Sequence, residues 1–215
     1  MISTSSHNEC NSDKYRIYAI SGNRGKDVDY QGKCYPELAP KLSFWKIWHD
    51  NIGKVSEEEN NRYYVQEYWN QVLSKLDPEK VYRELENSIL LCYENSTEFC
   101  HRHIVAAWFE ILLEVRVPEI KLKDYQIEEI ERPEYIKQYL DDAMRLNRNM
   151  RGFSSLRALY LFEEGEKLEY KADELEKKTG KYYDGYRQTA CFLRCDADMA
   201  EEEYKILKNQ KKLVK

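Results

Sequence analysis

Long apolar runs are missing from this 215-residue sequence, and no stretch approaches the roughly 18 consecutive apolar residues that a membrane-spanning helix requires. The first ten residues are polar and lack the apolar segment of a secretory signal. An excess of basic charge is missing too: the net charge is −5, with 14 Lys and Arg against 19 Asp and Glu in residues 1–120, and 20 against 20 in residues 121–215. We therefore expect a cytoplasmic protein that does not enter membranes, and the charge disfavours nucleic acid as a partner.

Two cysteine motifs are also missing. No two of the six cysteines have the Cys-x₂-Cys spacing of structural zinc sites. The Cys-x₅-Arg loop of cysteine phosphatases is absent as well, because Glu98 stands six residues after Cys92. Without a signal sequence, the cysteines are expected to be reduced thiols. The sequence therefore predicts neither a metal ion nor a cofactor.

The first half of the chain alternates strand and helix signals. The predicted elements are a disordered polar lead at 1–13, a strand at 15–20, helices at 43–50, 56–76 and from 78, a buried strand at 89–93, a helix from 99 or 100 to 117, and a strand at 119–122. The continuous apolar run at 89–93 is typical of a strand buried on both faces of a parallel sheet. The last strand–helix–strand set predicts a βαβ unit.

The second half changes to long, charged helices, predicted at 133–150, 155–178 and 182–208. We therefore expect an α/β fold: a small three-layer domain with a mainly parallel sheet at 14–124, followed by an all-α three-helix extension at 125–215. The last two helices are expected to form an antiparallel hairpin that turns at Thr179 and Gly180. Its uncovered apolar stripes predict a homodimer through this tail.

Reactive side chains gather at the end of the buried strand. Cys92 and Glu94 lie at its carboxyl end, and Cys100 and His101 fall in the first turn of the next helix. Ligands of parallel sheets bind at this edge, and a helix N-terminus favours anions and thiolates. Either Cys100 is therefore the candidate nucleophile, or His101 is the candidate general base, with Glu94 as its partner.

Two arginines are candidate anion ligands. Arg102 belongs to the same turn, and Arg24 follows the first strand, so its loop should open on the same sheet edge. A structural role stays open for each group: Cys92 as a core thiol, Glu94 as a solvated strand end, Arg102 as an ion-pair partner. Zinc is disfavoured because residues as close as Cys100 and His101 rarely converge on one ion.

The segments Leu90-Leu91-Cys92-Tyr93-Glu94 and Phe99-Cys100-His101-Arg102-His103 resemble the signature of the family catalogued as domain of unknown function 488. The segments Ile20-Ser21, Arg24-Gly25, Leu38-Ala39-Pro40 and Leu73 to Pro78 match its pattern too. The resemblance spans roughly residues 14–120 and implies a compact α/β fold. It also implies a common pocket lined by Arg24, Cys92, Glu94, Cys100, His101 and Arg102, with Tyr35 as a further ligand-binding candidate. The helical tail has no counterpart in short members of the family.

Two functions follow from these observations, and the sequence leaves both open. The first is an enzyme acting on a small anionic substrate, such as a nucleotide or nucleobase derivative, through the Cys/His/Arg/Glu cluster. The alternative is a non-catalytic ligand-binding or protein-interaction module whose helical tail mediates oligomerisation. Fold class alone cannot decide between them.

Overall fold

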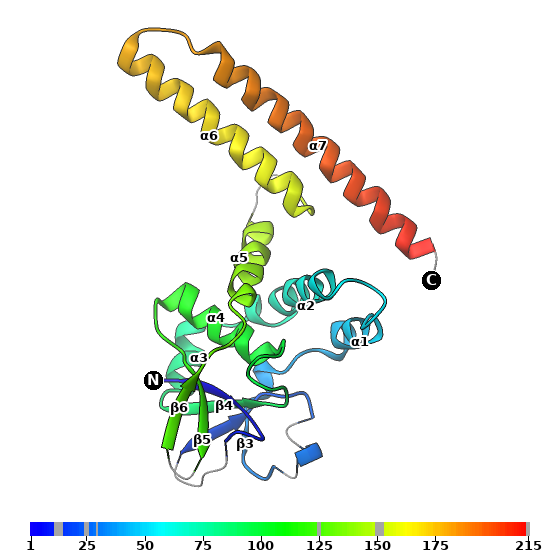
Figure 1. The fold of residues 1–215 in the computed structure, drawn as a ribbon, viewed down its shortest axis with the longest axis vertical. Helices are drawn as coiled ribbons and strands as arrows, with labels where there is room; N and C mark the ends of the chain where they lie inside the picture. Colours follow the sequence, from blue (N-terminus) through cyan, green and yellow to red (C-terminus); the bar gives the residue numbers. More distant parts are fainter. Residues whose placement is uncertain (11–14, 24–25, 29, 124–125, 149–152, 214–215) are drawn as a thin grey trace. The chain divides into compact units, whose positions relative to one another are not determined.

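The structure is a computed structural model that describes residues 1–10, 15–23, 26–28, 30–123, 126–148 and 153–213. It divides into two compact units, residues 1–144 and residues 145–215. The strands are β1 (Ser3–Ser6), β2 (Arg16–Ala19), β3 (Lys33–Cys34), β4 (Ser88–Cys92), β5 (Glu119–Lys123) and β6 (Gln126–Ile130) (Figure 1). The helices are α1 (Leu42–Asp50), α2 (Glu57–Gln71), α3 (Pro78–Glu84), α4 (His101–Leu113), α5 (Tyr135–Arg148), α6 (Leu156–Thr179) and α7 (Asp184–Leu213), with short 3₁₀ turns at Lys26–Val28, Pro36–Leu38 and Leu73–Lys75.

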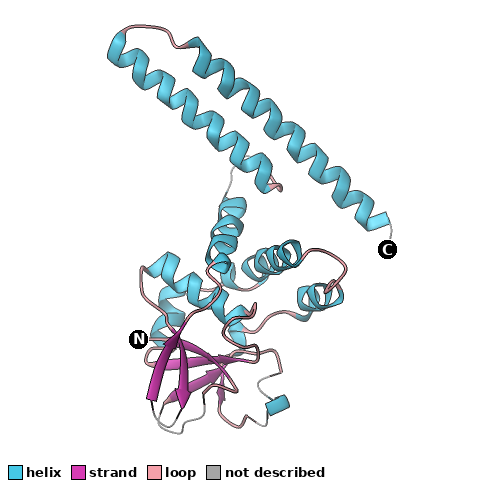
Figure 2. Ribbon diagram, in the orientation of Figure 1, coloured by secondary structure: helices cyan, strands magenta, loops and turns pink. Residues whose placement is uncertain are grey.

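The first unit is built on one sheet with the strand order β3-β2-β4-β1-β5-β6 (Figure 2). Its described strand pairs are parallel except for β5 with β6. Strands β2 and β4 are neighbours, with Ile17 opposite Ile89 and Tyr18 opposite Leu90. The predicted α/β class with a mainly parallel sheet, and the predicted adjacency of these two strands, are confirmed.

Strand β1 corrects the predicted disordered lead at residues 1–13. Residues 3–6 lie in the middle of the sheet, between β4 and β5, and three of their four side chains are buried. Their hydroxyls have internal partners: Thr4 Oγ1 donates to Glu119 Oε2 at 2.5 Å, and Ser5 Oγ donates to the Ile120 carbonyl at 2.7 Å. These bonds remove the cost of burying polar groups, so a polar sequence occupies a core strand.

Strand β4 separates two cores. Leu90 belongs to the larger one, where residues of α1 to α5 pack on the sheet around the fully buried Trp108. Ile89 and Leu91 point to the smaller core, which they share with Cys10, Ile120 and Leu122. Both faces of β4 are therefore buried, as the apolar run predicted, with the helical layer on one of them.

Local capping signals in the first unit are confirmed. Ser56 Oγ accepts a hydrogen bond from the Glu59 amide at 3.2 Å, and the Asp77 carboxylate accepts from the amides of Glu79 and Lys80. Among the described helices, none combines the length and apolar character needed to cross a bilayer. The antiparallel strand β6 had not been predicted; its residues are mostly exposed.

The second unit is a hairpin of α6 and α7, as predicted (Figure 1). Gly180 ends α6 in a left-handed conformation, with φ of 66°. Small residues form the seam between the helices at seven-residue intervals: Ala158, Gly165 and Ala172 on α6, and Ala190 and Ala197 on α7. At the open end, the Glu201 carboxylate accepts hydrogen bonds from the Ser154 and Ser155 amides, both at 2.8 Å. The two helices therefore approach closely, with α7 capping the N-terminus of α6.

The seam predicts a large effect of side-chain size at Gly165. A Cβ atom added there would lie 3.0 Å from the Ala190 carbonyl oxygen. Gly165→Leu is therefore expected to destabilise the hairpin by about 1–3 kcal/mol, the usual cost of overpacking. Gly185→Leu is the matched control, because a Cβ atom at Gly185 meets nothing within 4 Å. Thermal unfolding followed by circular dichroism should show a lower stability for Gly165→Leu and an unchanged stability for Gly185→Leu. Equal stability of the two variants would contradict a closely packed seam.

Candidate functional site

The predicted reactive residues meet at the carboxyl edge of the sheet. Strands β1, β2 and β4 run parallel, so the segments that follow them open on one edge. The loop after β4 carries Glu94 and leads to Cys100, which is the N-cap residue of α4. The segment after β2 contributes Ile20 and Ser21. Because β4 is flanked on both sides by parallel strands, this edge has the position where α/β sheets bind ligands.

Two thiols and one carboxyl group form the centre of the site. Cys100 Sγ lies 2.8 Å from Glu94 Oε2, and Cys92 Sγ lies 3.3 Å from the same oxygen. Both cysteines are buried, and Glu94 is partly buried. The carboxyl group therefore shares protons with both sulfur atoms in a space with little water.

His101 is held between the cluster and the backbone of the neighbouring strand. Its Nε2 lies 3.0 Å from the Ile20 carbonyl oxygen, which can only accept, so Nε2 carries a hydrogen. Its Nδ1 lies 3.4 Å from Cys92 Sγ. The imidazole therefore directs Nδ1 toward the thiols.

The surroundings of Cys100 favour its thiolate. Burial alone would raise the pKa of Cys100, but a hydrogen bond with Cys92 and the positive charges of Arg102 and His101 hold it well below its ordinary value. Burial lowers the pKa of His101, yet its interactions with the Cys100 thiolate outweigh burial and raise it. Both shifts favour the pairing of a Cys100 thiolate with a protonated His101 imidazole.

The pKa values of Glu94 and Cys92 are raised, whereas that of Cys100 is lowered. Burial, and then the negative charge of Cys100, raise the pKa of Glu94 to about 7. Burial raises the pKa of Cys92 well above its ordinary value. The cluster therefore combines one thiolate, one neutral thiol and a carboxyl group that gains and loses its proton near neutral pH.

Arg102 lies behind the cluster and does not line the cavity. It is 0% exposed, and its Nε and Nη2 contact Glu119 Oε1 at 3.0 and 2.9 Å. Its Nη1 donates to the Glu94 carbonyl at 2.7 Å. The expected ligand contact by Arg102 is therefore corrected: Glu119 holds the guanidinium inside the protein, where it fixes the Glu94 backbone and supplies positive charge to Cys100.

Glu119 is the residue that sequence reasoning missed. Besides Arg102 and Thr4, its carboxylate lies 3.4 Å from His103 Nε2. Burial would raise the pKa of Glu119, but the hydrogen bond with His103 and the charge of Arg102 lower it. His103 is buried, consistent with a packing residue rather than a ligand contact. No local signal marks Glu119, because its partners come from β1 and α4.

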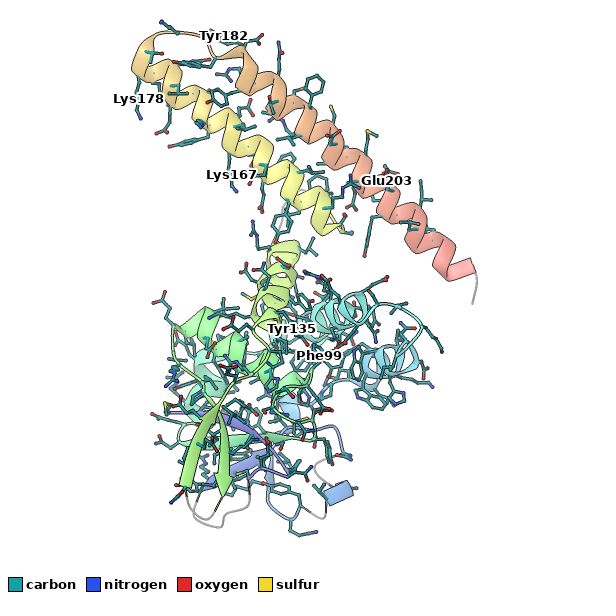
Figure 3. The ribbon with its side chains drawn as sticks, in the orientation of Figure 1. Phe99, Tyr135, Lys167, Lys178, Tyr182 and Glu203 are labelled. Carbon is teal, nitrogen blue, oxygen red and sulfur yellow. The ribbon has the colours of Figure 1, made fainter. Side chains whose placement is uncertain are left out.

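The cluster opens into a cavity of about 530 Å³ with aromatic walls. Cys92, Glu94, Cys100 and His101 line it on one side. Its other lining residues are Ser21, Gly22, Asn23, Pro40, Leu42, Trp45, Trp48, Tyr64, Tyr93 and Phe99. Phe99, labelled in Figure 3, packs its ring 5.8 Å from Trp48 and 5.3 Å from Tyr64. Helices α1 and α2 thus supply apolar, planar surfaces opposite the reactive groups.

Two further candidates are not among the described residues that line this cavity. Arg24 lies outside the described residues, although its neighbour in the chain, Asn23, lines the cavity and accepts a hydrogen bond from the Tyr93 hydroxyl. Tyr35 is described and lies elsewhere: its hydroxyl donates to the Glu84 carboxylate at 2.6 Å. The Tyr35 hydroxyl therefore binds a side chain of α3, and Tyr35 does not line the cavity as expected.

Three of the clustered residues have the chemistry of metal ligands. One ligand atom each from Cys92, Cys100 and His101 lies within 4.8 Å of the other two. The expectation that Cys100 and His101 do not converge is wrong, because Cys100 is extended, with φ of −148° and ψ of 145°, directly before the helical His101. Thiolate and imidazole suit zinc. However, zinc requires deprotonated sulfurs, and burial raises the pKa of Cys92 well above its ordinary value.

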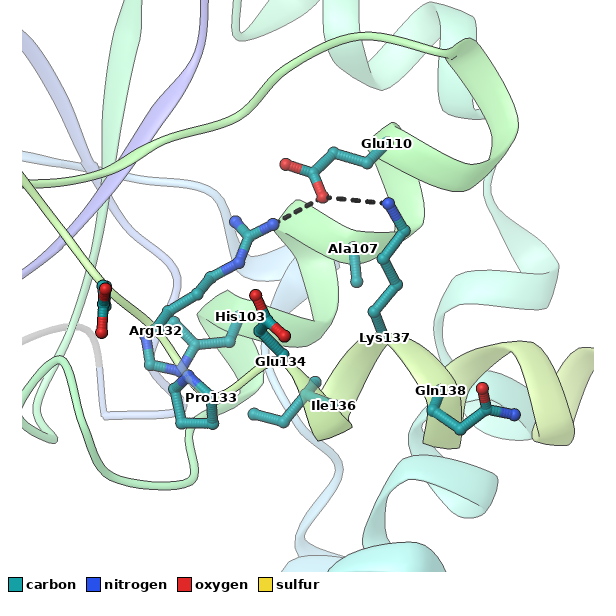
Figure 4. Close-up of a pocket in the computed structure, with 10 residues that line it drawn as sticks. His103, Ala107, Glu110, Arg132, Pro133, Glu134, Ile136, Lys137 and Gln138 are labelled. Atoms are coloured by element: carbon teal, nitrogen blue, oxygen red, sulfur yellow. Dashed lines mark hydrogen bonds and ion pairs between the residues drawn. The ribbon is translucent and has the colours of Figure 1, made fainter.

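A second cavity of about 590 Å³ lies between α4 and the segment leading into α5 (Figure 4). Three of its charged side chains are paired with one another: Arg132 Nη2 contacts Glu110 Oε2 at 2.5 Å, and Lys137 Nζ lies 3.7 Å from the same oxygen. No thiol lines it. The aromatic cavity is therefore the stronger candidate for a functional site.

Comparison with known protein families finds a match for the first unit. A family model described as the active DUF488-N3 subclade, DUF488-N3a, matches residues 6–112. This range contains the cluster and the whole aromatic cavity, and it ends before β5 and the helical hairpin. No curated protein and no solved structure matches the chain.

Proposed function

The part of the chain at residues 6–112 belongs to the family of domain of unknown function 488, and we propose that it is an enzyme using the Cys100 thiolate on a small anionic, nucleobase-like substrate. The observation that carries this proposal is the 2.8 Å contact between Cys100 Sγ and Glu94 Oε2 on the wall of the aromatic cavity. A thiolate beside a proton-carrying group is what nucleophilic catalysis needs. The matched subclade is described as active, which agrees with an enzyme.

The cavity walls support the substrate class. The rings of Trp45, Trp48, Tyr64 and Phe99 offer planar apolar surface to a flat heterocycle. Polar groups at the rim, from Ser21 and Asn23, suit the edge of such a ring. Arg24, next to Asn23 in the chain, is proposed to bind the anionic group, assisted by the N-terminus of α4.

In the proposed reaction, Cys100 Sγ attacks an electrophilic carbon of the substrate. A sulfur–carbon bond forms, the bond from that carbon to the leaving group breaks, and Glu94 gives its proton to the leaving group. Glu94, now a carboxylate, then takes a proton from water, which attacks the same carbon and releases the thiolate. His101 is proposed to stabilise the thiolate throughout as its imidazolium partner.

Alkylation of the full chain tests this proposal. Near pH 7, iodoacetamide should label Cys100 at least about tenfold faster than Cys92, because an ordinary thiol is only a few per cent ionised there. Mass spectrometry of peptides gives both rates. The exposed Cys191 and Cys195 serve as internal references, and Cys100→Ser should leave their labelling unchanged. Labelling of Cys100 slower than these references would contradict the nucleophile and favour a non-catalytic ligand-binding module.

Metal analysis separates this proposal from a zinc enzyme built on the same three ligands. The purified protein is expected to contain well under one zinc per chain by elemental analysis. Incubation with a chelator should leave the rate of Cys100 alkylation unchanged, because no metal shields the sulfur. Stoichiometric zinc, together with alkylation that accelerates on chelation, would show Cys100 to be a ligand and overturn its role as nucleophile.

A further inference from the structure

The outer side of α7 carries an apolar stripe that the hairpin does not cover. Phe192, Met199 and Ile206 recur every seven residues and are 69%, 63% and 54% exposed. Cys195, also exposed, lies between the first two on the same side. Seven residues are close to two helical turns, so these side chains lie in one line, opposite the Ala190 and Ala197 seam. This repeat is the pattern by which one helix packs along another.

The end of α7 also extends past its partner helix. At the first turn of α6, Ser155 contacts Glu201 and Arg157 contacts Glu203, which is labelled in Figure 3. Residues 204–213 continue α7 beyond that point for about 15 Å, as Figure 1 shows. Ile206 and Leu207 are exposed on this extension. The hairpin therefore leaves the side chains of Ile206 and Leu207 more than half exposed.

Charge along this stretch changes sign at one point. Residues 196–203, DADMAEEE, contain five acidic and no basic residues. Residues 204–215, YKILKNQKKLVK, contain five lysines and no acidic residue. A second α7 running in the opposite direction, with Met199 of one copy near Ile206 of the other, brings Lys205 and Lys208 of each copy beside the acidic segment of the other. A parallel partner would instead bring like charges together.

We infer that α7 pairs with α7 of a second copy of this chain, in antiparallel orientation, along the stripe of Phe192, Met199 and Ile206. The crossing point lies between Glu202 and Glu203, at the C-terminal end of the acidic segment. Met199 of each copy then packs near Ile206 of the other, which covers the extension of both helices. The resulting dimer does not depend on the proposed enzymatic activity, because its contacts lie in the second unit.

Sedimentation of the full chain tests the pairing. The wild-type protein, of 25.9 kDa, should sediment as a dimer of twice that mass at high micromolar concentration. Met199→Glu combined with Ile206→Glu should give the monomer mass with unchanged helix content by circular dichroism. Tyr170→Glu, an equally exposed apolar position on α6 outside the stripe, should remain dimeric. A monomeric wild type, or a double variant that stays dimeric, would overturn the inference.

Disulfide trapping in a Cys191→Ser background tests the orientation. Antiparallel pairing brings residue 209 of one copy near Cys195 of the other, whereas within one helix they are about 21 Å apart. Asn209→Cys should therefore crosslink two chains under mild oxidation, and Cys195→Ser should abolish the crosslink. A crosslink through Cys195 alone, a crosslink that survives Cys195→Ser, or a dimer that Asn209→Cys does not crosslink would each refute this arrangement.

Discussion

Arg102→Met is expected to lower the free energy of unfolding of the first unit by about 3–5 kcal/mol, the typical cost of leaving a buried charge without its partner. Arg102 and Glu119 are fully buried side chains that contact each other at 2.9 Å. Methionine fills much of the volume, so the loss comes mainly from the uncompensated Glu119 carboxylate. Urea unfolding at neutral pH, followed by tryptophan fluorescence, measures this change.

The matched control removes both charges. Arg102→Met with Glu119→Gln should recover part of the loss, because no unpaired charge then stays buried. Lowering the pH should also recover part of the stability of Arg102→Met, because protonation neutralises the unpaired Glu119 carboxylate. The pKa of Glu119 is depressed in the folded wild type, so the pair contributes stability above the ordinary value of 4.5, and this contribution disappears as pH falls through the folded pKa. A loss equal at pH 7 and pH 4 would contradict a charge effect.

Glu94→Gln is expected to flatten the pH profile of Cys100 alkylation. In the wild type, Glu94 donates its proton toward the Cys100 thiolate below its pKa of about 7 and weakens the nucleophile. The rate should therefore rise about tenfold from pH 6 to pH 8, following the ionised fraction of a group with pKa 7. Glutamine does not titrate, so this rise should vanish.

The same variant should lower turnover by about 10²–10⁴-fold once a substrate is in hand, as the loss of a general acid does. Glu98→Gln is the matched control: Glu98 is a carboxyl group of the same loop, exposed and engaged with the Asn95 amide. It should keep both the pH profile and the turnover of the wild type. A rise near pH 7 that persists in Glu94→Gln would assign the titration to another group of the cluster.

Much of the fold could be predicted because its signals are local. The capping residues Ser56 and Asp77, the apolar run of β4 and the glycine that ends α6 each act within a few residues. Strand β1 could not be predicted in this way. Its Thr4 and Ser5 are tolerated in the core by partners on β5, more than a hundred residues later in the chain. Periodicity records apolar burial and misses a strand whose burial depends on hydrogen bonds.

In the candidate site, too, the placements that follow from local order could be predicted, and those that depend on distant residues could not. The position of Cys92, Glu94, Cys100 and His101 at one sheet edge followed from the strand-to-helix order, and the structure brings these four residues together. The role of Arg102 did not follow, because a distant carboxylate, Glu119, decides whether its guanidinium faces a ligand or the interior. Tyr35 was likewise taken from a family pattern, whereas Glu84 on α3 holds its hydroxyl.

The central place of β1 also constrains how the chain folds as it is synthesised. This strand precedes the other described strands in the chain, yet Ser3 pairs with Ile89 and Thr4 with Glu119. The middle of the sheet cannot close until more than half of the chain has emerged, and contacts this distant in sequence slow folding. Before β4 has been synthesised, β2 and β3 can pair only with each other, and Arg102 has no Glu119 partner until β5 follows. We therefore expect the reactive cluster to be among the last parts of the first unit to form.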